Sequence, residues 1–549
     1  MMEHSFKGLK WEYLYKKVNP DKGLINRYGR FLGQLLANRG LKEPPASGGR
    51  ASYELLPDVE EAAHEILRAV KEDIPIVVFG DYDVDGLTST ALFSKLLKRL
   101  GARNFKPVVP ERTLGYGLTP EVVKKITSLA PEGLIVALDN ATKEVEAVKE
   151  ALKNGWRVVI FDHHEVGDEL PPVPLVNPKR FEENPLGIRE LSTVGLVYLF
   201  AEYLTTLGYD LEVESFLDLV AVGTVADVAP MGVTNANLVS KGLQLLENGE
   251  GSSIALARLI QNLNLRGLNE QDIAFRIAPR LNAFGRMGRA RAGLDFLLSE
   301  EEGKVLNYLE FMERLNKVRK ELSDSATKQL LEIYLKQPAP AFVFYSPRLP
   351  KGILGIIAGR LSSVLGIPTV VFSKSEDGTL VGSSRSPEGL NIVEVLSQME
   401  DLMTRWGGHA QAAGLSIRPE KLPEFKERFT SLVERTAFEP PALEIDFPIP
   451  PKVLKNSSNL TELLKTLAPF GPGNPQPTFV FDDILLEVEP SRYGYRLTFR
   501  DNGSFYVNVE KGQKINRAAL IVGRKVRVVY TVQNLSRREF SIVDFKPLV

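Results

Sequence analysis

The chain has 549 residues, several times the length of a typical domain of about 150 residues, so more than one domain is expected. Hydrophobic residues make up 44% and charged residues 25% of the chain, which excludes a disordered or fibrous protein. A net charge of −1 excludes a uniformly basic coat for nucleic acid, and the absence of cysteine excludes disulfides, zinc–thiolate sites and iron–sulfur clusters. The first ten residues contain no apolar stretch of a signal peptide, and no run of about 18 apolar residues occurs, so a cytoplasmic protein is expected.

The first half of the chain alternates short β-branched apolar runs with amphipathic stretches. The runs Ile74–Phe79, Leu134–Leu138 and Arg157–Phe161 predict buried strands. Between them, Thr88–Leu100 and Lys143–Lys153 have the periodicity of helices. This order of elements predicts an α/β domain built on a parallel, doubly wound sheet.

A charged helical stretch and a second mixed region follow. Residues 299–337 predict a solvated connecting helix. After it, Ala341–Tyr345 and Thr369–Phe372 predict strands, and Ile353–Leu365 predicts a helix of a second α/β domain. The proline-containing segments Glu439–Pro441 and Pro448–Pro451 predict a linker.

The C-terminal part changes to alternating strands separated by Gly and Asn, which predicts a small β-barrel. The predicted strands are Phe479–Phe481, Tyr495–Phe499, Ser504–Val509, Lys525–Tyr530 and Glu539–Val543. From Pro477 onward, 12 Lys and Arg residues stand against 8 acidic residues, in contrast to the balance of the whole chain. Aromatic residues interleaved with these bases are Tyr493, Tyr495, Phe505 and Tyr506. The mixture suits stacking of single-stranded bases over a basic groove, and packing of the rings inside the barrel is the alternative.

The strongest chemical signal is an acidic motif directly after the first predicted strand. Asp81, Asp83 and Asp85 alternate with other residues between two glycines. Unpaired carboxylates are costly to bury, so the motif predicts a bound cation, with solvated turn acids as the alternative. A calcium-binding loop is disfavoured because Leu92 occupies the position of its final glutamate.

Other segments also deliver possible metal ligands. Asp139 follows the second predicted strand, Asp162, His163 and His164 follow the third, and Asp227 lies in a nearly apolar stretch. The carboxyl ends of parallel strands meet at one edge of a sheet, so these side chains are expected to converge. Carboxylates and imidazoles without thiolates suit Mn²⁺ or Mg²⁺ better than Zn²⁺, and so many ligands indicate two ions. Two-metal centres hydrolyse phosphate esters, so these residues predict a phosphodiesterase.

These segments resemble the four motifs of the DHH phosphoesterase superfamily. More narrowly, four rare strings resemble the RecJ family of single-strand DNA exonucleases: Val222–Pro230, Pro279–Arg286, Gly407–Gly414 and Pro469–Phe479. The resemblance covers nearly the whole chain. It implies a DHH parallel-sheet catalytic domain, joined by a long helix to a smaller DHHA1 α/β domain, and a C-terminal OB-fold barrel that grips single-stranded DNA.

The resemblance also implies roles for individual residues. The candidate ligands of two Mn²⁺ or Mg²⁺ ions are Asp81, Asp83, Asp85, Asp139, His163 and Asp227. His164 is expected to contact the scissile phosphate or polarise a water, and Asp162 to orient a histidine. The candidate substrate-binding residues are Arg112, Tyr116, Arg280, Arg286, Ser383, Arg385 and His409, with a structural ion pair as the alternative for the arginines. The family usually has Gly where this chain has Ala141, which puts the geometry of that turn in question.

The resemblance predicts five parts along the chain. They are an N-terminal segment (1–50), the DHH catalytic domain (51–298), the connecting helix (299–337), the DHHA1 domain (338–437), and a linker with the OB-fold (438–549). The expected function is metal-dependent 5′-to-3′ degradation of single-stranded DNA to nucleotides in DNA repair and recombination. The polarity comes from the resemblance alone. The expected partners are single-stranded DNA and a single-strand-binding protein or RecQ-like helicase, and the protein is expected to be a monomer.

Two alternatives stay open. One is a DHH-type phosphodiesterase for nano-RNA or cyclic dinucleotides, which generally lacks a barrel. The other is a catalytically silent, Cdc45-like replication scaffold, in which the metal ligands should be eroded. The predicted barrel argues against the first, and the complete ligand set argues against the second.

Overall fold

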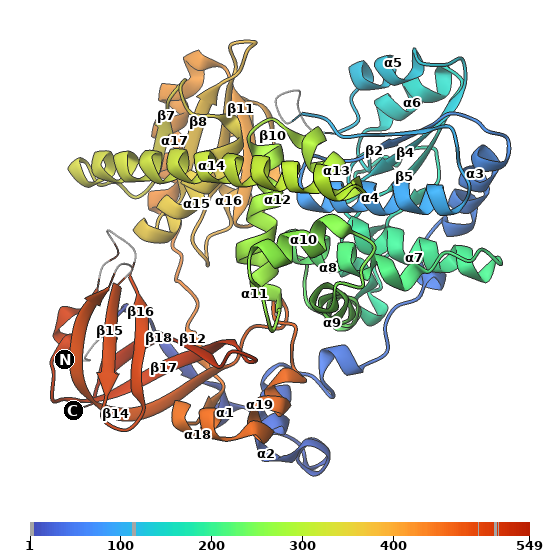
Figure 1. Ribbon diagram of the computed structural model, residues 1–549. Helices are drawn as coiled ribbons and strands as arrows, with labels where there is room; N and C mark the ends of the chain where they lie inside the picture. The colour runs from blue at the N-terminus through green and yellow to red at the C-terminus, as the bar shows by residue number, and fades with distance from the viewer. Residues whose placement is uncertain (1–4, 112–116, 492–493, 510–512, 514, 549) are drawn as a thin grey trace.

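The computed structural model describes residues 5–548 apart from 112–116, 492–493, 510–512 and 514. Three regions, each built around its own sheet, surround a central group of helices (Figure 1). The first sheet lies at the right of the view, the second at the upper left, and the C-terminal strands at the lower left. Arg112, Tyr116 and Tyr493 lie outside the described residues.

The first sheet is entirely parallel, as predicted, with the strand order β3–β2–β4–β5–β6. Its strands are β2 (Ile76–Phe79), β3 (Phe105–Val108), β4 (Gly133–Leu138), β5 (Trp156–Phe161) and β6 (Leu175–Val176). Every residue of β2 and β4 is buried, because helices cover both faces of the sheet. One face packs on α3 (Val59–Lys71), α4 (Val84–Arg99) and α7 (Thr193–Thr206). The other face packs on α5 (Pro120–Thr127) and α6 (Val145–Lys153).

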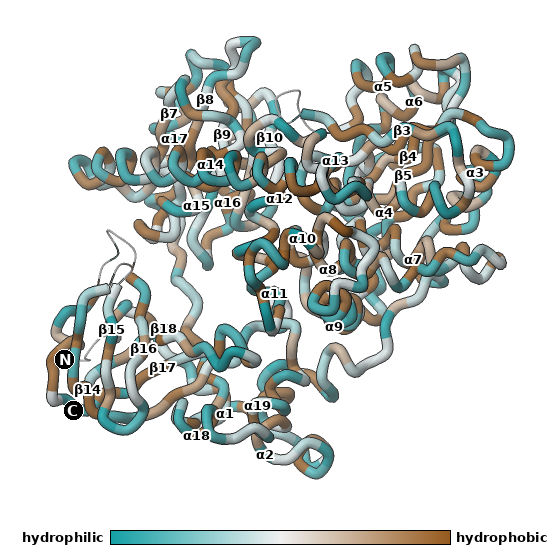
Figure 2. Tube along the Cα trace, viewed as in Figure 1, coloured by the Kyte–Doolittle hydropathy of each residue, from teal (hydrophilic) through white to brown (hydrophobic). Residues whose placement is uncertain are grey.

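A helical region completes the first part of the molecule and leads to the second sheet. It contains α8 (Leu217–Ala226), α9 (Val233–Asn248), α10 (Ile254–Asn262), α11 (Glu270–Asp272), α12 (Ala278–Arg286) and α13 (Ala290–Leu298). The predicted connecting helix is α14 (Glu302–Lys336), which packs against α12. Figure 2 shows apolar residues in the strands of the first sheet and an alternation of polar and apolar residues along α14.

The second sheet is mixed, with the order β10–β11–β9–β8–β7. Its strands are β7 (Phe342–Tyr345), β8 (Thr369–Lys374), β9 (Leu380–Arg385), β10 (Met403–His409) and β11 (Ala412–Ile417). Only the pair β7–β8 is parallel among these described strands. One face packs on α14 and α15 (Leu354–Leu365), and the other on α16 (Ile392–Ser397) and α17 (Leu422–Arg435).

The C-terminal strands pair in a ring. They are β14 (Thr478–Ser491), β15 (Gly494–Phe499), β16 (Gly503–Asn508), β17 (Lys525–Asn534) and β18 (Glu539–Pro547). The pairings run β14–β15–β16–β18–β17, and β17 pairs again with β14. Each of the five therefore has two neighbours, which is the pairing pattern of a small barrel. Phe505 is buried in the core of the ring, which is the packing alternative, whereas Tyr506 is exposed, so its stacking role stays a prediction.

The N-terminal segment packs on these C-terminal strands. β1 (Trp11–Tyr13) pairs in parallel with β12 (Leu443–Ile445), and β13 (Phe447–Pro448) pairs with β14. After α1 (Leu14–Lys17), the helix α2 (Lys22–Asn38) buries leucines in the core of the ring. Two short helices, α18 (Pro451–Asn456) and α19 (Ser458–Lys465), follow. Between the two segments predicted as a linker, β12 and β13 are not plain connections, because each pairs with a strand elsewhere in the chain.

Polar contacts fix the ring of strands to the helical region. Arg537 pairs with Asp272 of α11, and the Asn534 side chain donates to the Gly267 carbonyl at 3.1 Å. The Met231 N–H, just beyond α8, donates to the Pro472 carbonyl at 2.6 Å. Within the part of the chain that the structure describes, no helix has both the length and the apolar character needed to cross a membrane.

Candidate metal centre

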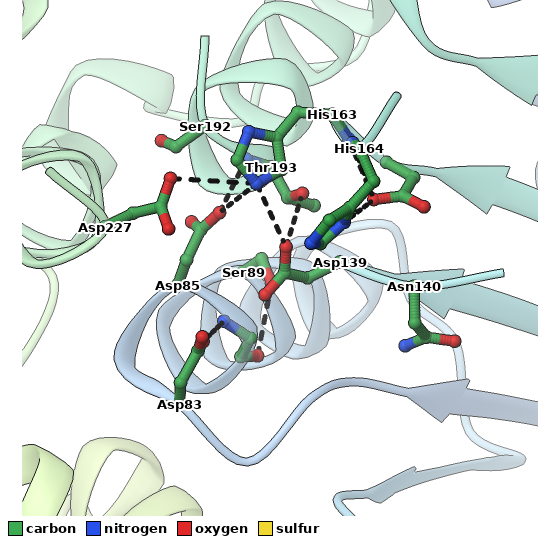
Figure 3. A network of polar contacts seen from close by, with 12 residues as sticks. Asp83, Asp85, Ser89, Asp139, Asn140, His163, His164, Ser192, Thr193 and Asp227 are labelled. Atoms are coloured by element: carbon green, nitrogen blue, oxygen red, sulfur yellow. Dashed lines mark hydrogen bonds and ion pairs between the residues drawn. The ribbon is translucent and has the colours of Figure 1, made fainter. Parts of the chain in front are cut away.

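The predicted ligands come from separate elements and meet at the carboxyl edge of the first sheet. Figure 3 shows Asp83 and Asp85 from the turn and first turn of α4, Asp139 from the end of β4, and Asp227 from the end of α8. His163 and His164 follow β5 and lie at the same edge of the sheet as these carboxylates. The convergence expected from the parallel topology is therefore present in the structure.

The turn from β2 into α4 explains the acidic motif. Asp83 caps the helix, because its carboxylate accepts a hydrogen bond from the Gly86 N–H at 3.0 Å. A Cβ at Gly86 would lie 2.5 Å from the Asp81 carbonyl oxygen, so only glycine fits there. The tight turn places Asp85 in the first turn of the helix, where the helix dipole favours negative charge.

His163 lies at the centre of the acidic cluster. Its Nε2 atom is 3.4 Å from Asp139 Oδ1, 3.6 Å from Asp227 Oδ2 and 3.9 Å from Asp85 Oδ2. Three overlapping groups have possible ligand atoms within 4.8 Å of one another: Asp85 with His163 and Asp227, Asp139 with His163 and His164, and Asp81 with Asp83 and Asp139. Asp139 and His163 each belong to two groups, as ligands shared between neighbouring ions would. The donor set therefore fits divalent cations such as Mn²⁺ or Mg²⁺.

Burial and mutual repulsion disfavour the charged forms of these carboxylates. Burial and the neighbouring Asp83 raise the pKa of Asp85 to about 7. Burial and the other carboxylates raise the pKa of Asp139 and of Asp227 well above the usual range. Burial and the charge of His164 lower the pKa of His163 to about 3, which leaves a neutral imidazole able to ligate. So much buried negative charge is stabilised most directly by a bound cation.

Asp162 and His164 form a pair beside the cluster. The Asp162 Oδ1 atom lies 2.7 Å from His164 Nδ1, and the carboxylate also accepts the N–H groups of His163 at 2.8 Å and Thr142 at 3.0 Å. Burial favours a raised pKa for Asp162, but His164 outweighs it and holds that pKa below the usual range. Burial favours a lowered pKa for His164, but Asp162 raises it to about 9. His164 is therefore a cation at neutral pH, with its ring oriented by Asp162.

Three residues that support the centre were not predicted from the sequence. The Thr193 N–H donates to Asp85 Oδ2 at 2.7 Å, and its hydroxyl donates to Asp139 Oδ1 at 3.2 Å. The Val194 N–H donates to Asp85 Oδ1 at 3.0 Å, so the first turn of α7 holds both oxygens of one carboxylate. The Asn177 side chain donates to the His164 carbonyl at 2.9 Å. Ser192 and Thr193, at the start of α7, form a typical helix start. That pattern is the sequence signal that could have indicated Thr193.

The turn after β4 keeps a left-handed backbone. Asp139 has φ 63° and Ala141 has φ 81°, a region that costs an L-residue about 1–2 kcal/mol. The turn is therefore left-handed at Ala141 even though this chain has alanine where the family usually has glycine. The strain is located directly at a candidate ligand, where such conformations concentrate.

The described substrate-binding candidates lie on the second sheet and in α12. Ser383 and Arg385 lie on β9, and the Arg385 guanidinium donates to Ser383 Oγ at 2.9 Å. His409 ends β10, and its pKa is lowered by burial and by the charges of Lys179 and His164. The second sheet therefore brings His409 into the electrostatic range of the centre.

The two candidate arginines of α12 make different contacts. Arg286 donates to the Gly352 carbonyl at 3.1 Å and lines a pocket beside the centre. Arg280 pairs with Glu313 of α14 at 2.6 Å, which is the structural alternative considered for such arginines. No contact of Arg280 with the described ligand residues is observed, so its predicted role at a phosphate stays a prediction.

Comparisons with known proteins agree with this architecture. The DHH family N-terminal domain matches residues 75–224, and the DHHA1 domain matches residues 339–435. The single-stranded-DNA-specific exonuclease RecJ of Salmonella typhimurium is 32% identical over 478 residues, 82% of each chain. That of Escherichia coli is 32% identical over 497 residues, 84% of this chain and 85% of its own.

Solved structures give the same result. A crystal structure of RecJ in complex with Mn²⁺ from Thermus thermophilus has a TM-score of 0.83 and 28% identity, and covers 98% of this chain and 79% of that chain. A complex of the Thermus protein with Mg²⁺ has a TM-score of 0.75. The two matched domains and the acidic edge of the sheet define a DHH-type protein with a DHHA1 domain. More narrowly, the chain belongs to the RecJ family.

Proposed function

We propose that the protein is a metal-dependent exonuclease that degrades single-stranded DNA from the 5′ end to nucleotides, in DNA repair and recombination. The observation that carries this proposal is the complete cluster around His163 at the edge of the first sheet, in a chain of the RecJ family. The curated relatives carry the name single-stranded-DNA-specific exonuclease. The 5′ polarity rests on the family resemblance.

The residues that would hold two divalent ions are Asp81, Asp83, Asp85, Asp139, His163 and Asp227. Divalent ions bound there supply Lewis acidity for phosphodiester hydrolysis. His164, protonated at neutral pH, donates a hydrogen bond to an oxygen of the scissile phosphate, while Asp162 fixes its ring. Thr193 and Val194 keep the Asp85 carboxylate in place through their N–H groups.

The DNA strand would bind across both sheets. Arg385, supported by Ser383, and His409 bind phosphates from the second sheet. Arg112 and Tyr116, outside the described residues, are proposed to hold the 5′ end. The ring of C-terminal strands is proposed as an OB-fold that grips single-stranded DNA, as the excess of basic residues there favours. We also propose that the chain is divided into the five parts predicted from the sequence.

Protein partners and location belong to the same proposal. A single-strand-binding protein or RecQ-like helicase would present or generate the strands that such an exonuclease consumes. We propose a monomer that acts in the cytoplasm. The short-substrate phosphodiesterase is disfavoured by the closed ring of strands, and the silent scaffold by the intact ligand cluster.

The test compares 5′-labelled and 3′-labelled single strands, with Mn²⁺, for wild type and Asp139→Ala. We expect wild type to release label first from the 5′ end and the variant to release almost none. Asp210→Ala, at an exposed acid, controls for the loss of one charge. Unchanged degradation by Asp139→Ala would contradict the metal site, and preferential release of 3′ label would contradict the polarity.

A further inference from the structure

A pocket of about 620 Å³ opens beside the candidate metal centre. Its walls come from the end of α8, from α11, the turn Ile273–Ile277 and α12, from α14 and α15, and from the loop at residues 470–476. Val225, Ala226 and Val228 line it, and these residues flank the candidate ligand Asp227 on both sides. The pocket therefore lies against the stretch of chain that carries Asp227. Figure 1 shows α11 and α12 in the middle of the molecule, between the three sheets.

Two irregularities of the backbone present apolar side chains at this pocket. Val228 has φ 59°, which is strained for a β-branched residue, and it is 65% exposed. Phe275 lies in the middle of a π-helical turn, Ile273–Ile277, and it is 74% exposed. π-helical turns and left-handed β-branched residues both concentrate at functional sites. The two occur in separate segments and line the same pocket, so their coincidence indicates a ligand with an apolar face.

The charges around the pocket indicate that this ligand is also anionic. Arg286 and Arg319 line it together with one carboxyl group, that of Glu270. Glu270 is 5% exposed, and burial raises its pKa to about 7, which weakens its negative charge. An apolar wall with a surplus of guanidinium groups matches a flat, uncharged ring joined to a phosphodiester.

We propose that this pocket is a nucleobase subsite, in which one base of the substrate strand stacks on Phe275 beside Val228 while an adjoining phosphate faces Arg286. The inference rests on the proposed function, and it adds a binding site to the metal centre. Every base has a π-face, so stacking retains the strand without selecting its sequence. Such a subsite would hold the strand in place between successive cleavages.

The test uses single strands that carry one 2-aminopurine, a fluorescent adenine analogue quenched by stacking, moved one nucleotide at a time along the strand. Binding is measured in EDTA, which keeps the strand intact. At one position we expect quenching by wild type and by Phe275→Trp, and none by Phe275→Ala. Phe275→Ala should also weaken binding of an unlabelled strand by about tenfold. Tyr209→Ala, at an exposed aromatic residue after α7, is the control and should bind as wild type does.

The outcomes separate this inference from the function on which it rests. If wild type degrades and binds single strands but the quenching pattern is the same in Phe275→Ala, the subsite is refuted and the proposed function stands. If wild type neither binds nor degrades single strands, both are refuted. Because Phe275 is largely exposed, its truncation should leave the fold intact, which the unfolding midpoints of the variants would verify.

Discussion

Replacing Asp85 by asparagine should change the stability of the metal-free protein in a pH-dependent way. The pKa of Asp85 is 3.8 in its ordinary state and about 7 in the folded protein, where burial and Asp83 disfavour the anion. An acid whose pKa is higher in the folded than in the unfolded state lowers the free energy of unfolding as pH rises between these two pKa values. Above the folded-state pKa, this destabilisation stays constant. At about 1.4 kcal/mol per pKa unit, this cost is about 2 kcal/mol near pH 5 and about 4 kcal/mol near pH 8.

The asparagine also loses a favourable contact. Both oxygens of Asp85 accept N–H groups, from Thr193 and Val194, and an amide can accept with its one oxygen only. Leaving one buried N–H unsatisfied costs about 1–3 kcal/mol at every pH. Asp85→Asn should therefore lie within about 1 kcal/mol of wild type in stability near pH 5 and exceed it by about 1–3 kcal/mol near pH 8. The difference should grow by about 2–3 kcal/mol between these conditions.

The assay is urea unfolding in EDTA, followed by Trp fluorescence, since Trp156 is buried in the same sheet. Asp210→Asn, at an exposed acid, is the matched control. Saturating Mn²⁺ should stabilise wild type far more than Asp85→Asn, which reverses their order near pH 8. A difference that stays constant or falls as pH rises would refute the repulsion that we assign to the cluster.

Three further predictions concern activity. Asp227→Ala should abolish nucleotide release while single-strand binding in EDTA persists, as a band-shift assay would show. Arg385→Ala should raise KM about tenfold with little change in kcat, because it removes binding and not chemistry; a fall in kcat alone would contradict this. Asp162→Asn should let the pKa of His164 fall from about 9 towards 6.5. A pH–rate profile should then show a greater loss near pH 8 than near pH 6.

Much of the centre could be predicted because it depends on local rules. A buried strand followed by alternating acids predicts a strand-to-helix turn, and β2 and α4 are found there. The parallel order of strands then brings Asp139 and His163 to the same edge without further information. The main local error is the start of α4, which begins at Val84 because Asp83 caps it.

Contacts between distant segments could not be predicted in the same way. Pairing of β1 with β12 joins residues that are far apart in the sequence, Trp11 with Leu443, and no pattern in either strand indicates its partner. Arg280 shows the same limit, because its pairing with Glu313 depends on how α12 packs against α14. The exposure of Phe275 likewise follows from a π-helical turn that no periodicity in the sequence indicates.

The contacts of Asp85 show how the fold prepares the centre for cations. Its carboxylate is held by two N–H groups of α7, and these bonds need no metal to form. The fold therefore positions the ligands in advance and bears the cost of their repulsion, which the raised pKa of Asp85 records. Relief of that repulsion adds to the affinity for divalent ions, because binding removes a cost already present in the metal-free protein. The preorganised cluster thus lowers the stability of the metal-free protein and, for the same reason, raises its affinity for divalent ions.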